Sequence, residues 1–172
     1  MDDLNKFQSE FVKNSCYRMD ESFRMIRISL EKISEKEVWE RPNTSLNSIG
    51  NLILHLCGNM TQYGITSLKG TDDLRERSIE FSTKGGLLKE ELIERLEVTV
   101  NEIKTCFENV SIERLLVKKK VQGYNFSGIG NIIHVVEHFS YHTGQIAFWV
   151  KQITNEQLGF YDGQDLNIKN ED

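Results

Sequence analysis

Proline is nearly absent from this sequence, since a single one, Pro42, occurs in 172 residues. Because proline interrupts helices more strongly than any other residue, long stretches of the chain are free to be helical. Long hydrophobic runs are also missing, and none approaches the roughly 20 residues that a membrane-spanning helix needs. The first residues have neither the basic start nor the apolar segment of a secretory signal. We therefore expect no membrane segment and a cytoplasmic location.

A surplus of basic residues is missing as well, because the net charge is -5. Nucleic-acid binding needs a concentrated basic face, and the one basic run, at residues 118–120, is short. The three cysteines, Cys16, Cys57 and Cys106, are odd in number, far apart and without metal-type spacing. These features predict no nucleic-acid partner, and unpaired thiols in a reducing compartment.

The chain does contain apolar residues at helical spacing. From Cys16 onward they recur in steps of three and four, which predicts one long helix whose pattern ends near Trp39, just before Pro42. A second helix is expected to start after Asn47 or Ser48, either of which can cap it, and to run to about residue 69.

Two more helices are predicted in the second half of the chain, over about residues 87–107 and from Ser127 to about Ile153. The polar stretch 70–86 before them is long for a connection in a compact bundle, so we expect it to contain a turn of helix or a functional loop. The β-branched residues of 113–126 predict a short extended or hairpin segment.

Four amphipathic helices without convincing strand alternation predict an all-α fold, because a four-helix bundle is the simplest way to bury their apolar faces. We expect one domain over residues 1–153 and a polar tail, loosely docked or frayed, over residues 154–172.

The histidines are the most informative residues. His134, His138 and His142 are each four residues apart, and a step of four advances only about 40° around a helix, so they form a slanting row. This row borders the apolar face of its helix, and His55 has the same setting in the second predicted helix. Glu137 falls on roughly the opposite side.

A single inward histidine is more often a hydrogen-bonded core residue than a metal ligand, and one H-x-x-x-H pair on a helix often occurs by chance. A third imidazole on a second helix favours the metal interpretation, because i, i+4 histidine pairs are typical of helical zinc sites. The spacing therefore indicates an ion shared by His55 and two adjacent histidines of this row.

Two passages, Ser48–Asn59 and Val136–Ile146, resemble the DinB-like superfamily of bacterial metal-binding four-helix bundles, which includes thiol-dependent transferases. The family pattern is a histidine in the second helix and an H-x-x-x-H pair in the helix that closes the site, followed by a stretch such as x-G-Q. The resemblance covers about residues 4–153. It implies an up-down-down-up bundle with His55, His138 and His142 as ligands of zinc or nickel, and a homodimer.

Three neutral imidazoles leave a coordination position open, as in catalytic zinc sites. The resemblance therefore implies a metal-dependent enzyme that acts on a small molecule, held as thiolate if it is a low-molecular-weight thiol. Attack on an amide or ester by metal-activated water is the alternative reaction. We find no Asp or Glu obviously beside the histidines, which disfavours a hydrolase and leaves a thiol S-transferase as the first candidate.

Further residues are candidates for orienting a substrate or the ligands. His134, Tyr63 and Gln145 are the catalytic candidates, and Asn59 and Tyr141 share their neighbourhood on the helical wheels. We expect His134 to lie behind the ligands or to face a substrate rather than to bind the ion.

Two other functions fit the same histidines. The protein can be a non-catalytic metal-binding or stress-response bundle with a structural ion, or an interaction module whose histidines only hydrogen-bond one another. A catalytic site needs an open coordination position that faces a pocket, so solvent access separates the first of these from an enzyme.

Overall fold

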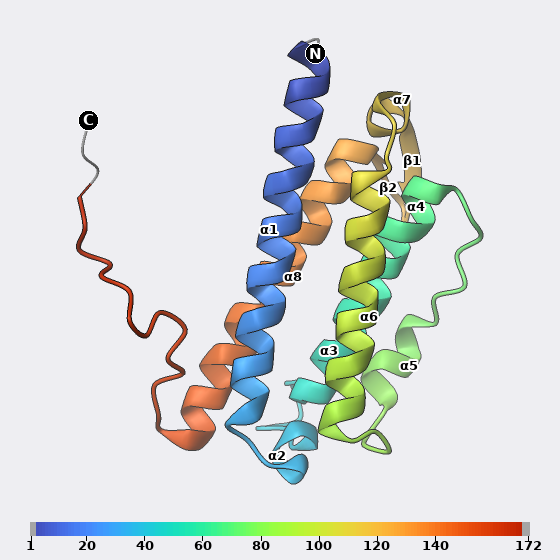
Figure 1. The fold of residues 1–172 in the computed structure, drawn as a ribbon. Helices are drawn as coiled ribbons and strands as arrows, with labels where there is room; N and C mark the ends of the chain where they lie inside the picture. The colour runs from blue at the N-terminus through green and yellow to red at the C-terminus, as the bar shows by residue number, and fades with distance from the viewer. Residues whose placement is uncertain (1–2, 170–172) are drawn as a thin grey trace.

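A computed structural model describes residues 3–169 and is built around four long helical segments. In Figure 1, α1 (Asp3–Glu31) runs down, α3 (Ile49–Asn59) and α6 (Lys89–Glu108) run up, and α8 (Gly128–Thr154) runs down again. When the molecule is turned upside down, these directions become up-down-down-up, which is the order that the resemblance implies. The prediction of an all-α helical bundle is confirmed.

The predicted end of the first helix, near Trp39, is wrong. The structure divides this stretch into α1 and a separate short helix, α2 (Glu35–Trp39). Ser34 makes the break: its side chain accepts a hydrogen bond from the Glu37 amide, and the Glu37 carboxylate accepts one from the Ser34 amide. This reciprocal capping box starts a new helix and stops the old one.

The second predicted helix starts as expected, with Ser48 as its N-cap and Asn51 completing the capping box. It then passes without interruption into a π-helical segment, η1 (Met60–Thr66), and a last turn, α4 (Ser67–Lys69). Gly70 ends it in the left-handed conformation with φ +76°, which glycine adopts without strain. π-Helical turns are frequent at functional sites, so the segment after α3 is of interest for function.

The polar stretch between α4 and α6 contains one short helix, α5 (Arg77–Ser82), which packs against α3. Before α8 the chain forms α7 (Ile112–Leu116) and the antiparallel strands β1 (Lys118–Val121) and β2 (Tyr124–Ser127). The predicted hairpin is therefore present. Its two-residue turn has positive φ at Gln122 and Gly123, as tight hairpin turns require.

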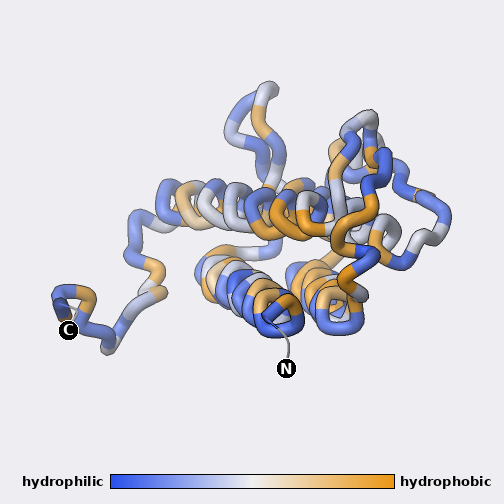
Figure 2. Tube along the Cα trace, turned by 90° about the horizontal axis from the view of Figure 1, so that it is seen from above, coloured by the Kyte–Doolittle hydropathy of each residue, from blue (hydrophilic) through white to orange (hydrophobic). Residues whose placement is uncertain are grey.

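The core lies between the four long segments, where hydrophobic side chains recur at helical spacing, and Figure 2 shows hydrophobic and hydrophilic stretches alternating along the helices. Ile53, Leu96, Phe139 and Ile146 are fully buried. Leu88 follows the apolar spacing of the helix expected over residues 87–107, which predicts burial, but it is 59% exposed at the N-cap of α6.

The remaining expectations concern the tail, the cysteines and the membrane. Leu158 is buried and the Phe160 carbonyl accepts a hydrogen bond from Arg24, so the start of the tail contacts the bundle. Residues 170–172 of the predicted tail, and residues 1–2 of the predicted domain, lie outside the described part of the chain.

The three cysteines are buried, and they are unpaired, as expected. Over residues 3–169, no helix has the length and apolar character needed to cross a membrane.

Replacing Leu96 by alanine should lower the free energy of unfolding by about 2–5 kcal/mol, because the fully buried side chain would leave a cavity in the core. The matched change at the N-cap of the same helix, Leu88→Ala, removes an exposed side chain and should change the free energy of unfolding by less than about 0.5 kcal/mol. Urea unfolding followed by circular dichroism measures both. Equal losses for the two variants would contradict this placement of the core.

Candidate metal centre

The histidines lie on helices whose starting points are fixed by their own sequence. The Ser48–Asn51 capping box starts α3 two turns before His55. Ser127 starts α8, because its side chain accepts a hydrogen bond from the Gly130 amide. Since a cap sets the first residue of a helix, it also sets which later residues face the partner helix.

His55 of α3 meets His138 and His142 of α8 inside the bundle. The ring centroids are 5.0 Å apart for His55 and His138, 5.1 Å for His55 and His142, and 4.5 Å for His138 and His142. One ring nitrogen from each lies within 4.8 Å of the others. The predicted convergence of imidazoles from two helices is therefore present in the structure.

The outer nitrogens of two of these rings have hydrogen-bond partners that fix which nitrogen carries the proton. His142 Nδ1 lies 2.7 Å from Gln145 Oε1, and His55 Nδ1 lies 2.9 Å from Glu80 Oε2. Because both partners are acceptors, each Nδ1 donates its proton outward and each Nε2 keeps a lone pair. His55 Nε2 lies 2.9 Å from His138 Nε2. The lone pairs therefore face the interior of the cluster.

Glu80 is a residue that the sequence interpretation missed, and the expectation that no carboxylate lies beside the histidines was wrong. Its side chain is 10% exposed and receives two hydrogen bonds from Arg75, from Nε at 2.7 Å and from Nη2 at 2.8 Å. Burial by itself raises the pKa of Glu80, but the hydrogen bonds from Arg75 and His55 outweigh it and hold the pKa below its usual range. The carboxylate is therefore ionised.

Arg75 is the second missed residue, and its side chain is only 4% exposed. Besides Glu80 it donates to Gln62 Oε1 of η1 at 2.8 Å. Its Nη2 also lies 3.1 Å from His55 Nδ1, because both are donors that converge on the same Glu80 oxygen. The stretch between α4 and α6 thus supplies a buried ion pair behind the histidine cluster.

Two members of the cluster are shielded from solvent, since His55 is 6% and His142 is 9% exposed, whereas His138 is half-buried. Burial, together with the neighbouring histidines, lowers the pKa of His138 to about 3, and burial also lowers the pKa of His142. His138 and His142 are consequently neutral near pH 7, which is the form of histidine that binds metal ions.

His134 lies beside the cluster and outside it, as predicted. Its ring stacks on that of His138 with the centroids 5.3 Å apart and makes a tilted contact with the ring of Tyr63 at 4.1 Å. Its Nε2 lies 3.2 Å from Asn59 Nδ2. Burial lowers its pKa. Oδ1 of the buried Asn59 has no hydrogen-bond partner within the described chain. His134, Asn59 and Tyr63 thus form a partly satisfied polar and aromatic wall next to the three histidines.

The remaining residues near the histidines differ in how they contact the cluster. Gln145 orients His142, as described above. The exposed Tyr141 has its ring 5.0 Å from that of His142 and makes an edge contact with it. Glu137 is exposed and, as expected, does not join the cluster.

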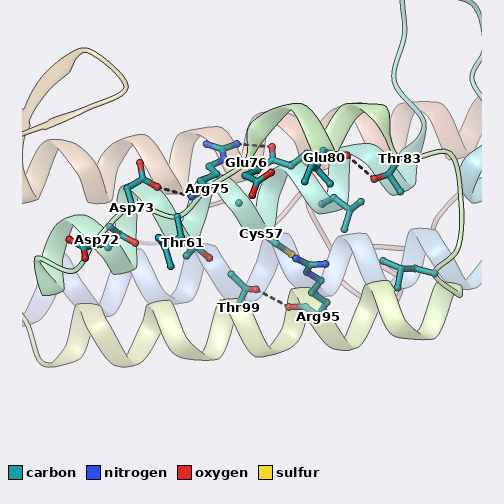
Figure 3. Close-up of a pocket in the computed structure, with 16 residues that line it drawn as sticks. Cys57, Thr61, Asp72, Asp73, Arg75, Glu76, Glu80, Thr83, Arg95 and Thr99 are labelled. Carbon is teal, nitrogen blue, oxygen red and sulfur yellow. Dashed lines mark hydrogen bonds and ion pairs between the residues drawn. The ribbon is translucent and has the colours of Figure 1, made fainter.

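A cavity of about 520 Å³ is lined in part by the Arg75–Glu80 pair. Figure 3 shows Arg75 and Glu80 along one wall and Thr99 and Arg95 of α6 along the other, with Cys57 between them. None of the four histidines lines this cavity. Burial raises the pKa of the Cys57 thiol to about 11, so it is not a reactive thiolate.

The residues present fit a divalent ion. Three imidazoles, two of them with lone pairs fixed toward the interior by hydrogen bonds, form a donor set typical of zinc, nickel, copper or iron(II). Across residues 3–169, no Cys, Asp or Glu joins this group as a further ligand. The same contacts allow His138 Nε2–H to donate to His55 Nε2, so hydrogen bonding within the cluster stays an alternative.

Comparisons with known proteins agree with this fold. A family model described as "Protein of unknown function (DUF1572)" matches residues 6–161, whereas a search of curated proteins gave no match. Among solved structures, the chain is similar to a conserved protein from Enterococcus faecalis, with a TM-score of 0.71 and 14% identity over 84% of this chain and 97% of that one. It is also similar to the DinB-like protein YjoA from Bacillus subtilis, with a TM-score of 0.63 and 15% identity over 86% of this chain and 93% of that one.

Replacing Arg75 by methionine should lower the free energy of unfolding by about 3 kcal/mol or more, because it leaves the buried Glu80 carboxylate without its charge partner. The control is Lys104→Met, which breaks the more exposed pair with Asp20 and should cost less than about 1 kcal/mol. Chemical unfolding measures both. Losses of similar size would show that the Arg75–Glu80 pair does not behave as a buried one.

Proposed function

This chain belongs to the DUF1572 family, which is DinB-like, and from this premise we propose that it is a metal-dependent enzyme acting on a small molecule. One observation carries the proposal: His55, His138 and His142 bring their ring nitrogens within 4.8 Å of one another from two separate helices. Hydrogen bonds on the outer side of the cluster leave its lone pairs facing inward.

A thiol S-transferase is the activity that we favour. A divalent ion held by the three histidines would act as a Lewis acid that favours the thiolate form of a low-molecular-weight thiol. His134, Asn59 and Tyr63 form the adjoining wall and would position the substrate, the unpartnered Asn59 oxygen offering a hydrogen-bond acceptor.

Hydrolysis is less well supported, although a carboxylate is now known to lie near the cluster. Both oxygens of Glu80 are occupied by Arg75, and one of them also binds His55. A general base needs a lone pair within reach of the proton that it removes. Glu80 contacts the outer face of His55 instead, so we assign it no role as a base.

The non-catalytic metal-binding or stress-response protein is the second candidate. It is favoured by the low exposure of His55 and His142 and by the position of the 520 Å³ cavity, which the histidines do not line. The half-buried His138 and His134 favour the enzyme, because they leave one side of the cluster partly accessible. Zinc or nickel as the ion, a cytoplasmic location and a homodimer belong to the proposal as well.

Metal binding is tested by single substitutions of the histidines. The wild-type protein, purified without an affinity tag, should bind one equivalent of zinc, whereas His138→Ala and His142→Ala should abolish binding because each removes a ligand. His134→Ala is the control and should keep most of the affinity. Isothermal titration with zinc measures all four proteins. Absence of binding by the wild type, or equal losses for the three variants, would overturn the assignment.

The proposed thiol chemistry has a spectroscopic test. Adding a low-molecular-weight thiol such as cysteine to the Co²⁺-loaded protein should produce a thiolate-to-metal charge-transfer band, because the three histidines leave a coordination position for it. S-Methylcysteine, which cannot form a thiolate, should not produce the band. If the two compounds give the same spectrum, the ion does not bind a thiolate and the transferase proposal loses its support.

A further inference from the structure

Glu80 reaches the histidine cluster from a part of the chain that contributes none of the proposed ligands. It lies in α5, whereas His55 lies in α3 and the other two histidines lie in α8. Its Oε2 is 2.9 Å from Nδ1 of His55, so the carboxylate accepts the proton of the nitrogen that faces away from the cluster. A carboxylate in this position fixes both the tautomer and the ring orientation of a histidine ligand.

The backbone around Glu80 is held in place by side chains of the bundle. Asn51 Nδ2 donates to the carbonyl oxygen of Glu80 at 2.9 Å and to that of Thr83 at 2.7 Å, and Arg41 donates to the carbonyl of Phe81. The Phe81 ring lies 4.9 Å from the ring of His55. α5 is therefore anchored directly over His55, and the Glu80 side chain needs no rearrangement to reach it.

Gly58 provides the space for this contact. A Cβ atom at position 58 would lie 2.0 Å from Glu80 Oε1 and 2.9 Å from Arg75 Nε, which is closer than atoms can approach. Any larger residue would therefore push the carboxylate and the guanidinium away from α3. Because these atoms are the ends of flexible side chains, the backbone of α3 would not need to move.

We propose that Glu80 is a positioning residue of the metal centre: seated against Gly58 and held by Arg75, it orients His55 so that Nε2 faces the ion. The proposal rests on the function proposed above. It makes the connection between α4 and α6 a part of the metal centre, and it assigns a purpose to the buried ion pair.

Two variants test this without touching a proposed ligand. Gly58→Ala displaces the Glu80 carboxylate by steric contact, and Glu80→Gln removes its charge while keeping its size. Both should weaken zinc binding about 10- to 100-fold, which is the usual effect of losing the hydrogen-bond partner of a metal ligand. The controls are Gly144→Ala, where an added Cβ meets nothing within 4 Å, and Glu76→Gln on the wall of the same cavity. Both should bind zinc like the wild type.

A metal-free measurement separates this proposal from the proposed function. ¹⁵N NMR of the imidazoles should show His55 as the Nδ1–H tautomer in the wild type and in Gly144→Ala, with a shift toward Nε2–H in Gly58→Ala. If the wild type binds zinc and both Gly58→Ala and Glu80→Gln bind it equally well, the positioning role is wrong and metal binding stands. If none of the proteins binds zinc, the proposed metal binding is wrong. The tautomer of His55 then tests by itself whether Glu80 orients this ring: Nδ1–H in the wild type supports it, and Nε2–H overturns it.

Discussion

The structure depends on the close approach of three imidazoles inside a helical bundle. Two of them donate their protons outward, to Glu80 and Gln145, so their lone pairs meet in the interior. Lone pairs that face one another at about hydrogen-bond distance repel unless a proton or a cation lies between them. Protonation of the cluster is disfavoured, since burial and the neighbouring rings lower the pKa of His138 to about 3. A divalent ion satisfies these lone pairs together, whereas a proton shared by His55 and His138 satisfies only part of the set.

The rest of the molecule can be understood as the support of this cluster. Capping residues fix the start of α3 and α8 and thereby the faces on which the histidines lie. η1 follows directly after α3 and supplies Gln62, which accepts a hydrogen bond from Arg75. Arg75 in turn holds Glu80 against His55. The polar groups behind the cluster thus form one connected network, in which a loss at one member is transmitted to the ligands.

The features that could be predicted from the sequence are those with local causes. Helical periodicity gave the four long segments, and the four-residue spacing on one helix placed His134, His138 and His142 in a row. The break before α2 was missed although its signal is local, because Ser34 and Glu37 form a recognisable capping box. Leu88 follows the apolar spacing but lies at a helix start, where the core does not reach it.

Glu80 and Arg75 could not be found by periodicity, because they lie in a polar connection whose path over α3 depends on tertiary contacts. Two signals did exist in the sequence. The connection is longer than a bundle requires, and Gly58 stands within a helix, where glycine is unfavourable unless something packs closely against it. Together they indicated a close approach to α3, but not which side chains would make it.

The central claim is tested most directly by diffraction from crystals of the protein grown with zinc, with data collected on both sides of the zinc absorption edge. The account predicts a single strong anomalous peak between the Nε2 atoms of His55, His138 and His142. A map without a peak there, or with its only peaks on surface carboxylates, would contradict it and leave a cluster of histidines that merely hydrogen-bond one another.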